Sequence, residues 1–370
     1  MTLLVTLLLF SNKILNVLSS ADGDFVGDYD FQHCVCVPYW QCKEDYSGLI
    51  EDGIDIIDIR SADTGDKSGK YPSRCTGDYD VCCQVECGKR RIVRNGVLTN
   101  RMGGYVDFFA TRILGDNNEA EFAEFPWMLG LLEDKTYRCG ASLIHPQVAL
   151  TAAHCVMGDG PFIIRAGEWN WESREEPLPY QNQQAKEIII HPQYHPGSLR
   201  NDIAILILEA PFRLSENVGI VCLPFQGTEF EDIRNQGSDC IATGWGKNAA
   251  RHGKYQATLK KVSMPVLPRN DCTWKLREVR LGPFFRLHKS FICAGGQANK
   301  DTCKGDGGSP LVCPIRERPG KYQQAGIVSW GLTCGLHATP GVYVNIALFR
   351  DWIDFIVQAY GFDSTVYRVT

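Results

Sequence analysis

The chain has 370 residues, 44% of them hydrophobic, and a formal net charge of -5 at pH 7. A length and an apolar fraction of this kind suit one large domain with a packed core and one smaller domain. The weakly acidic balance argues against nucleic acid or an anionic membrane as a partner. The 16 cysteines, an even and high number, indicate an oxidising compartment.

The N-terminus has the pattern of a secretory signal. An apolar run over residues 1–10 is far too short to span a bilayer, and the small residues Ser19, Ser20 and Ala21 follow it. We therefore predict a signal peptide over residues 1–21 and a secreted, extracellular mature protein. No later stretch is long enough for a membrane helix, so we expect no membrane partner.

Six cysteines lie between Cys34 and Cys83, and the last two of them are adjacent. A segment this small cannot bury a large core, so it needs covalent cross-links. The alternative, a zinc site, is weaker because the only histidine near the segment is His33. We predict a disulfide-rich module over residues 34–83, and spacing alone leaves its connectivity open.

Between the third and fourth cysteines, an acidic strand-like run ends at Arg60 and a stretch rich in Gly, Ser and Asp follows. Such a loop is exposed, so a protease can reach its backbone. We predict processing by cleavage between Arg60 and Ser61. Residues 84–112 show no clear period, and we interpret them as a linker whose basic Arg91 and Arg94 are fallback cleavage sites.

Residues 113–370 read as short alternating strands separated by Gly, Pro and Asn turns, which predicts a mainly β domain. Near the end, after Asn345, apolar residues recur at helical spacing and predict one amphipathic helix. The residues on this helical face are Trp352, Ile353, Ile356, Val357 and Tyr360.

Three separated motifs in this domain carry the residue types of nucleophilic catalysis. His154 lies in a Thr-Ala-Ala-His-Cys motif, Asp202 precedes an apolar run, and a Gly-rich loop spans residues 301–310 with the sequence DTCKGDGGSP. An aspartate that orients a histidine, and a histidine that takes the proton of a nucleophile, form the relay that this chemistry needs. A lone histidine or aspartate is more often structural, and what distinguishes these three motifs is that together, in this order, they resemble the motifs of one known family.

These motifs resemble the histidine, aspartate and nucleophile motifs of the trypsin-like serine proteases, in which Cys-x-Gly-Asp is followed by Ser-Gly-Gly-Pro. Here Gly307 stands where that family has the serine. A glycine offers no oxygen that could attack a carbonyl. We therefore predict that the chain is not an active protease and that His154 and Asp202 persist as a vestigial buried pair.

A displaced nucleophile is the alternative, because Ser309 lies two residues beyond the expected position. Two residues span roughly 6–7 Å along an extended chain. A nucleophile and its base need a hydrogen bond of about 3 Å. An active protease that uses Ser309 is therefore the weaker interpretation.

The resemblance also implies a substrate pocket. Asp301, six residues before Gly307, matches the carboxylate that receives Arg or Lys in trypsin-like proteases, and Gly331 and Gly341 match the pocket walls. Gly305 and Gly307 would present the N–H groups of an oxyanion hole. Two alternatives stay open: a surface carboxylate beside a cysteine, and a decoy that captures Arg-containing peptides without cutting them.

The activation hinge departs from the family pattern. Residues 112–116 have the sequence RILGD where the family has Arg-Ile-Val-Gly-Gly. In active members, cleavage there frees an isoleucine amine that inserts beside the aspartate of the nucleophile loop, here Asp306. Asp116 replaces a glycine, and glycine often serves backbone conformations that other residues adopt poorly. We expect an eroded hinge.

The cysteine module resembles the clip domain of arthropod haemolymph proteases, so the mature chain resembles a clip-domain serine protease homologue. This implies a trypsin/chymotrypsin-like double β-barrel with a C-terminal helix, preceded by a small clip domain. We place the clip domain at 34–83, the linker at 84–112 and the protease homologue domain at 113–370. The disulfides that the resemblance implies are Cys34–Cys82, Cys36–Cys75, Cys42–Cys83, Cys87–Cys222, Cys139–Cys155, Cys240–Cys313, Cys272–Cys293 and Cys303–Cys334.

Within that family, the resemblance is to cofactors of prophenoloxidase activation of the factor II type. It implies a haemolymph protein that assists melanisation, a reaction of innate immunity, by binding. The expected partners are prophenoloxidase, its activating clip protease and an upstream processing protease, with a homo-oligomer after cleavage as a further expectation. We expect no cofactor, and an acidic loop with Glu168, Asn170 and Glu175 leaves calcium as an alternative.

Overall fold

Two β structures organise the part of the chain that the structure describes. The computed structural model describes residues 34–38, 42, 80–91, 97–99, 105–107, 118–158, 160–173, 175–230, 239–246, 255–296, 306–332 and 339–369. Among these residues no helix is long and apolar enough to cross a membrane. The predicted signal peptide and the predicted cleavage site at Arg60 and Ser61 lie outside the described residues.

The N-terminal cysteine module contains a two-stranded antiparallel sheet. Strand β1 (Cys34–Pro38) pairs with β2 (Asp80–Gln84). A disulfide joins Cys42 to Cys83, two residues that are 41 positions apart. Closing so long a loop limits the freedom of the unfolded segment, which is how a small module without a large core is stabilised.

The interval 84–112, interpreted as a linker, contains regular structure. Strands β3 (Val97–Thr99) and β4 (Tyr105–Asp107) form a second two-stranded antiparallel sheet. Strands of three residues are too short to produce a recognisable alternation of apolar and polar residues. No pattern in the sequence predicts these two strands.

The segment that follows the clip strands is fastened to the main body of the chain. A disulfide joins Cys87 to Cys222, and the Nε atom of Arg90 donates to Oε1 of Glu124 at 3.0 Å. Lys261 also binds Glu124, which is only 2% exposed. A buried carboxylate needs such charged partners, so Arg90 acts as a structural anchor of this segment.

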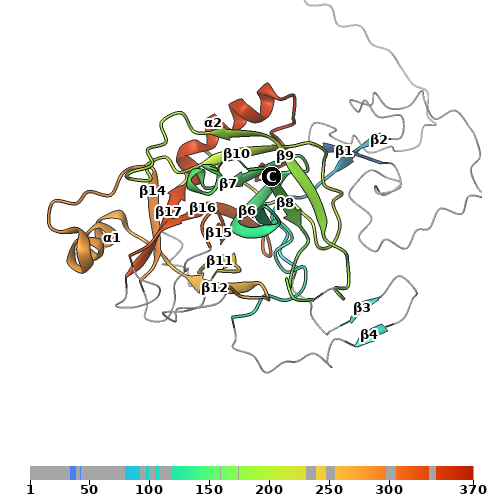
Figure 1. Cartoon of the computed structure of the whole chain (residues 1–370), viewed down its shortest axis with the longest axis horizontal. Helices are drawn as coiled ribbons and strands as arrows, with labels where there is room; N and C mark the ends of the chain where they lie inside the picture. The colour runs from blue at the N-terminus through green and yellow to red at the C-terminus, as the bar shows by residue number, and fades with distance from the viewer. Residues whose placement is uncertain are drawn as a thin grey trace, which may run out of the picture. The chain divides into compact units, whose positions relative to one another are not determined.

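The first β structure is a closed barrel of six antiparallel strands, drawn from teal to yellow-green in Figure 1. Around the barrel the order is β10-β7-β6-β5-β8-β9. Every residue of β7 and β10 is buried, whereas buried and half-buried residues alternate along β8. The strands are β5 (Met128–Glu133), β6 (Thr136–His145), β7 (Val148–Thr151), β8 (Phe162–Ala166), β9 (Gln181–Ile190) and β10 (Ala204–Leu208).

The second β structure is a barrel-like sheet of seven strands, drawn from yellow to red in Figure 1. Its order is β12-β11-β15-β16-β17-β14-β13. The strands are β11 (Cys240–Gly244), β12 (Lys260–Met264), β13 (Val266–Leu267), β14 (Phe291–Gly295), β15 (Pro310–Pro314), β16 (Tyr322–Trp330) and β17 (Pro340–Asn345). The prediction of a mainly β double barrel with a C-terminal helix is confirmed.

The C-terminal helix α2 (Ile346–Ala359) begins directly after Asn345. Of the predicted apolar face, Ile353 and Val357 are buried, while Tyr360 follows the last helical residue and is exposed. A second helix, α1 (Arg269–Leu276), was not predicted. It buries only two side chains, which is too few to give a helical period in the sequence.

Five disulfides fall within the described residues, and each is a pair that the resemblance implies. They are Cys42–Cys83, Cys87–Cys222, Cys139–Cys155, Cys240–Cys313 and Cys272–Cys293. Each of the other three implied pairs, Cys34–Cys82, Cys36–Cys75 and Cys303–Cys334, has at least one cysteine whose side chain lies outside the description.

Candidate functional site

The histidine and aspartate motifs meet because the strands beside them are paired. Strand β7 runs antiparallel to β10, with Thr151 opposite Ala204. His154 follows Thr151 on a short 3₁₀ turn, and Asp202 shortly precedes Ala204. In an antiparallel pair, the end of one strand lies beside the start of its neighbour. The pairing therefore brings both side chains to one end of the first barrel.

Asp202 is fully buried and accepts three hydrogen bonds. The backbone N–H of His154 donates to Oδ1 at 2.8 Å, and Nδ1 of the same residue lies 2.7 Å from Oδ2. The hydroxyl of Ser329 donates to Oδ2 at 2.6 Å. Because an ionised carboxylate can only accept, Nδ1 carries the ring proton and Nε2 points away from the aspartate. Ser329 lies two residues before the expected pocket wall at Gly331, and no sequence motif indicates its contact with Asp202.

Gly307 lies at the open nitrogen of the histidine ring. Its carbonyl accepts the N–H of Gly140 at 2.9 Å, which fixes the loop against β6. A Cβ atom added at Gly307 would lie 2.7 Å from Nε2 of His154. A side chain at this position would therefore point directly at the imidazole. The site holds a base and its orienting carboxylate, and the residue that faces them has nothing to deprotonate.

Ser309 points elsewhere. Its side chain is fully buried, and a Cβ atom added at Gly140 would collide with its hydroxyl oxygen. The same oxygen would lie 3.2 Å from a Cβ added at Gly244, on β11. Ser309 thus faces the interior between the two β structures. This orientation argues against the interpretation of Ser309 as a displaced nucleophile.

The carboxylate of Asp306 is also directed inward. The N–H of Gly246 donates to its Oδ1 atom at 2.8 Å. Burial, followed by the charge of Asp306, raises the pKa of the Tyr137 hydroxyl well above its usual value. Asp306 therefore has partners among the described residues without an inserted amine, and the hinge at residues 112–116 lies outside the description.

Only part of the expected pocket is described. Gly331 is exposed, and a Cβ added there would meet no described atom within 4 Å, so this wall leaves open space. Gly341 is buried in β17 opposite Ala294 of β14. Asp301 and Gly305 lie outside the described residues. The pocket carboxylate and the first oxyanion donor therefore stay predictions.

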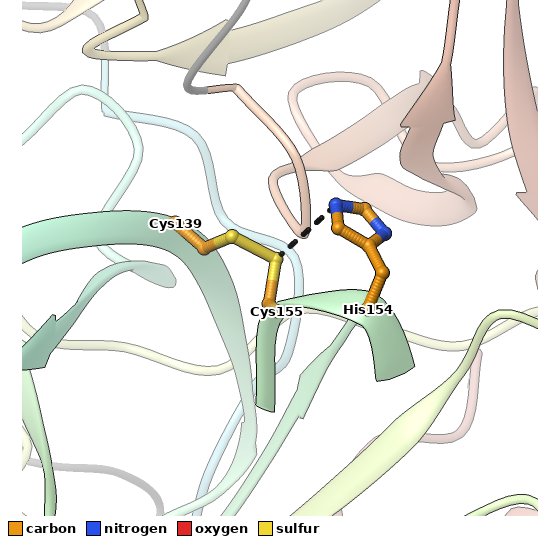
Figure 2. Close-up of side chains that lie close together, drawn as sticks. All are labelled: Cys139, His154 and Cys155. Carbon is orange, nitrogen blue, oxygen red and sulfur yellow. Dashed lines mark hydrogen bonds between the residues drawn. A yellow bond between two sulfur atoms is a disulfide. The ribbon is translucent and has the colours of Figure 1, made fainter. Parts of the chain in front are cut away.

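A disulfide borders the same space as the histidine. Figure 2 shows Cys139, His154 and Cys155, whose ligand-type atoms lie within 4.8 Å of one another. Cys139 and Cys155 are bonded to each other, so their sulfurs are not thiolates that could bind a metal. The Sγ atom of Cys155 lies 3.6 Å from Nε2 of His154.

The acidic loop places two carboxylates together, but not the pair expected. Glu176, not Glu175, faces Glu168, and Glu175 is exposed. Within the described residues, one buried oxygen of Glu168 and one of Glu176 accept no hydrogen bond. Burial, with the charge of Glu168 as a further cause, raises the pKa of Glu176 to about 7.

Glu168 already has a cationic partner, because Nη1 of Arg165 lies 2.9 Å from its Oε2 atom. Calcium, which prefers oxygen ligands, stays an alternative at this loop. Glu168 and Glu176 would hold such an ion through the two oxygens that lack donors. The side chain of Asn170 bonds the backbone N–H of Glu172, so it serves the loop itself.

Comparisons with known proteins agree with the geometry. Residues 115–353 match the family model described as Trypsin, and residues 28–84 match the one described as Serine protease Clip domain PPAF-2. The chain is 47% identical over 271 residues to "Phenoloxidase-activating factor 2" of Galleria mellonella, which covers 69% of this chain and 88% of the relative.

Two mosquito relatives align over nearly the whole chain. "Inactive CLIP domain-containing serine protease A8" of Anopheles gambiae is 35% identical over 369 residues, covering 92% of this chain and 94% of the relative. "Inactive CLIP domain-containing serine protease A28" of the same species is 40% identical over 352 residues, covering 88% and 90% respectively.

Proposed function

The chain belongs to the trypsin family and carries an N-terminal clip domain, and on this premise we propose that it is a secreted, non-catalytic cofactor of prophenoloxidase activation. One observation carries the proposal: the residue that faces Nε2 of His154 is Gly307. The histidine is oriented for proton transfer, yet no nucleophile stands in front of it. A protease fold in this state can still bind partners.

The relatives support both halves of the proposal. Two relatives that align with most of the chain are named as inactive proteases. The relative from Galleria mellonella is named for activating phenoloxidase. The partners that follow for this chain are prophenoloxidase or its activating clip protease, in haemolymph. Assembly into a homo-oligomer after processing belongs to the same proposal.

Processing by an upstream clip protease would cut between Arg60 and Ser61. The disulfide Cys42–Cys83 spans this bond, so the two pieces would stay joined after the cut. The fallback site at Arg91 is less suitable, because Arg91 is half-buried and its Nη1 atom lies 3.9 Å from Oε1 of Glu216. A cut at Arg60 would therefore free the clip domain to rearrange without releasing it.

N-terminal sequencing of the processed chain tests this site. The new terminus is expected at Ser61, and a dominant start at Ile113 would show that the chain is cut like an ordinary protease zymogen. One band on a non-reducing gel and two on a reducing gel are expected. Two bands without reductant would mean that no disulfide spans the cut.

Reconstitution tests the function itself. Purified prophenoloxidase and its activating protease are incubated with the processed chain, with the uncut chain, or with the Arg60→Gln variant exposed to the same upstream protease. Of the three samples, we expect only the processed chain to raise phenoloxidase activity clearly above the level reached by prophenoloxidase and its activating protease without any added chain. Equal activity with all three samples would contradict a cofactor role.

A second candidate is a decoy for Arg-containing peptides, favoured by Gly331, where an added Cβ would meet none of the described atoms within 4 Å. Benzamidine is the probe, since its amidinium mimics an Arg side chain. Binding that disappears in Asp301→Asn but not in Asp271→Asn, a change on the surface of α1, would support the decoy. Equal binding to both variants would exclude the Asp301 pocket as the site.

A further inference from the structure

The disulfide Cys139–Cys155 lies against the imidazole that the missing serine would have used. Sγ of Cys155 is 3.6 Å from Nε2 of His154 (Figure 2). A Cβ added at Gly307 would lie 2.7 Å from Nε2 and 3.6 Å from this sulfur. The glycine therefore leaves the ring and the sulfur facing each other across the nucleophile position.

The ring is already arranged to support a thiolate. Nδ1 of His154 is occupied by Asp202, so Nε2 is the nitrogen directed at the sulfur. A protonated ring would donate from Nε2 to a thiolate on one side and from Nδ1 to the aspartate on the other. A nearby cationic histidine stabilises a cysteine thiolate and makes it a better leaving group.

We propose that Cys139–Cys155 is a redox-active disulfide that accepts electrons from dithiols, with His154 stabilising the Cys155 thiolate that its reduction releases. The site is distinct in chemistry from proteolysis and from the binding role proposed above. Its reductant is a dithiol, whether a small molecule or a reduced protein disulfide reductase. The reduced form would hold a cysteine, a histidine and an aspartate in one hydrogen-bonded row.

The exchange is a two-electron transfer in two steps. The first thiol of the dithiol loses its proton, which is taken up by Nε2 of His154, and the resulting thiolate attacks Sγ of Cys139. A mixed disulfide forms, and the electron pair of the broken S–S bond goes to Cys155 as a thiolate paired with the protonated ring. The second thiolate of the reductant then attacks its own sulfur in the mixed disulfide. This releases Cys139, which takes a proton from solvent, and the reductant leaves as a disulfide.

The exposures fit this direction of attack. Cys139 is 6% exposed and Cys155 is 1% exposed. The sulfur on the less buried residue is attacked, and the sulfur beside the histidine leaves. The disulfide Cys240–Cys313, between β11 and β15, is the internal comparison because its cysteines are buried to 1% and 0%. Access alone could favour Cys139–Cys155, so the test must also remove the histidine contact.

The test is the rate of reduction by dithiothreitol, followed by alkylation and mass spectrometry of the peptides that hold each cysteine. In the unmodified full chain, we expect Cys139–Cys155 to open at least about ten-fold faster than Cys240–Cys313. His154→Gln should slow Cys139–Cys155 by about ten-fold and leave Cys240–Cys313 unchanged. Equal rates for the two disulfides, or no effect of His154→Gln, would overturn the proposal.

A second variant tests the same contact without replacing His154, in case His154→Gln fails to fold. Gly307→Ala adds only a methyl group, which must displace the ring from Nε2's present position, so it should slow the same disulfide while keeping both His154 and Asp202. If both variants act through one contact, the double variant should be no slower than His154→Gln alone. Additive losses, or an unchanged rate in Gly307→Ala, would show that the contact does not govern the exchange.

Discussion

The two halves of the candidate site differ in how many partners each residue has. On the side of the first barrel, Asp202 accepts three hydrogen bonds and is fully buried, so each of its partners depends on it. On the loop before β15, Gly307 faces the histidine with no side chain at all. A side chain in that position would contact chiefly the histidine ring and could be lost without leaving a buried group unsatisfied.

This difference explains how a protease fold can lose its nucleophile and still keep its barrels and its histidine–aspartate pair. Removing a buried carboxylate leaves its donors without acceptors, which costs folding free energy. Removing the nucleophile costs catalysis only, because the hydroxyl serves the reaction and not the fold. Stability therefore maintains the relay, while the nucleophile position is free to change.

Repairing the loop should give the largest effect. A triad nucleophile is worth about 10⁶-fold in turnover, or roughly 8 kcal/mol of transition-state stabilisation. We expect Gly307→Ser alone to recover little activity toward Arg-amide substrates. The triple variant Gly307→Ser, Ser309→Gly and Asp116→Gly, with cleavage forced at Arg112, should hydrolyse them measurably.

The matched control for this repair is the same triple variant left uncut, which should stay inactive. Strong activity from Gly307→Ser alone would mean that the loop and hinge have not changed beyond the nucleophile. A fully repaired and cut variant without activity would mean that the differences between this site and a working one extend further than these residues.

Breaking the relay should give the next largest effect, and on stability. Asp202→Ala leaves the donors on His154 and Ser329 without their acceptor and should lower the free energy of unfolding by about 3 kcal/mol. Asp351→Ala, an exposed aspartate on α2, should change it by less than about 0.5 kcal/mol. Denaturant unfolding with disulfides intact measures both changes. Equal effects would mean that the folding free energy does not depend on the hydrogen bonds of Asp202.

Glu176 should have a smaller effect on stability than Asp202. In contrast to Asp202, it has one buried oxygen that accepts no hydrogen bond from the described residues. Its folded-state pKa is raised from 4.5 to about 7, so the folded chain holds an extra proton between these values. The stability from that proton is fully present below pH 4.5 and is lost as the pH rises through about 7. After discount for solvent screening, the loss is on the order of 1 kcal/mol.

Glu176→Gln should remove this slope while its remaining oxygen still accepts from the backbone N–H groups of Trp169 and Asn170. Melting temperatures at pH 5 and pH 8 check the expectation, with Glu175→Gln at the exposed neighbour as the control. If the pH dependence of the melting temperature survives in Glu176→Gln but disappears in Glu175→Gln, the titrating carboxylate is Glu175 and the expectation is wrong.

Much of the site could be predicted from short motifs, because each motif contains both the functional residue and the residues beside it in the chain. The histidine and aspartate motifs adjoin apolar strands, and the pairing of those strands brings His154 and Asp202 together. Contacts between distant segments could not be read in this way. Ser329 reaches Asp202 from another strand, 127 positions away.

Two other features of the site depend on the local path of the backbone. Glu175 and Glu176 are adjacent and chemically identical, and only the backbone path of the loop decides which one turns inward. The direction of Ser309 depends on the turn at Gly308, whose φ of 80° is in the left-handed region. A sequence motif gives the spacing of residues along the chain, but it does not show that a turn at Gly308 directs the next side chain inward.

The most direct test of the central claim combines two readings of one sample. The natural chain, after processing, is assayed for Arg-amide hydrolysis and for labelling by a serine-directed phosphonate, and in parallel for its effect on prophenoloxidase activation. We predict no hydrolysis, no label, and a clear gain in phenoloxidase activity. Hydrolysis that the phosphonate abolishes would contradict the account, because it would show a working nucleophile in a site where Gly307 faces the histidine.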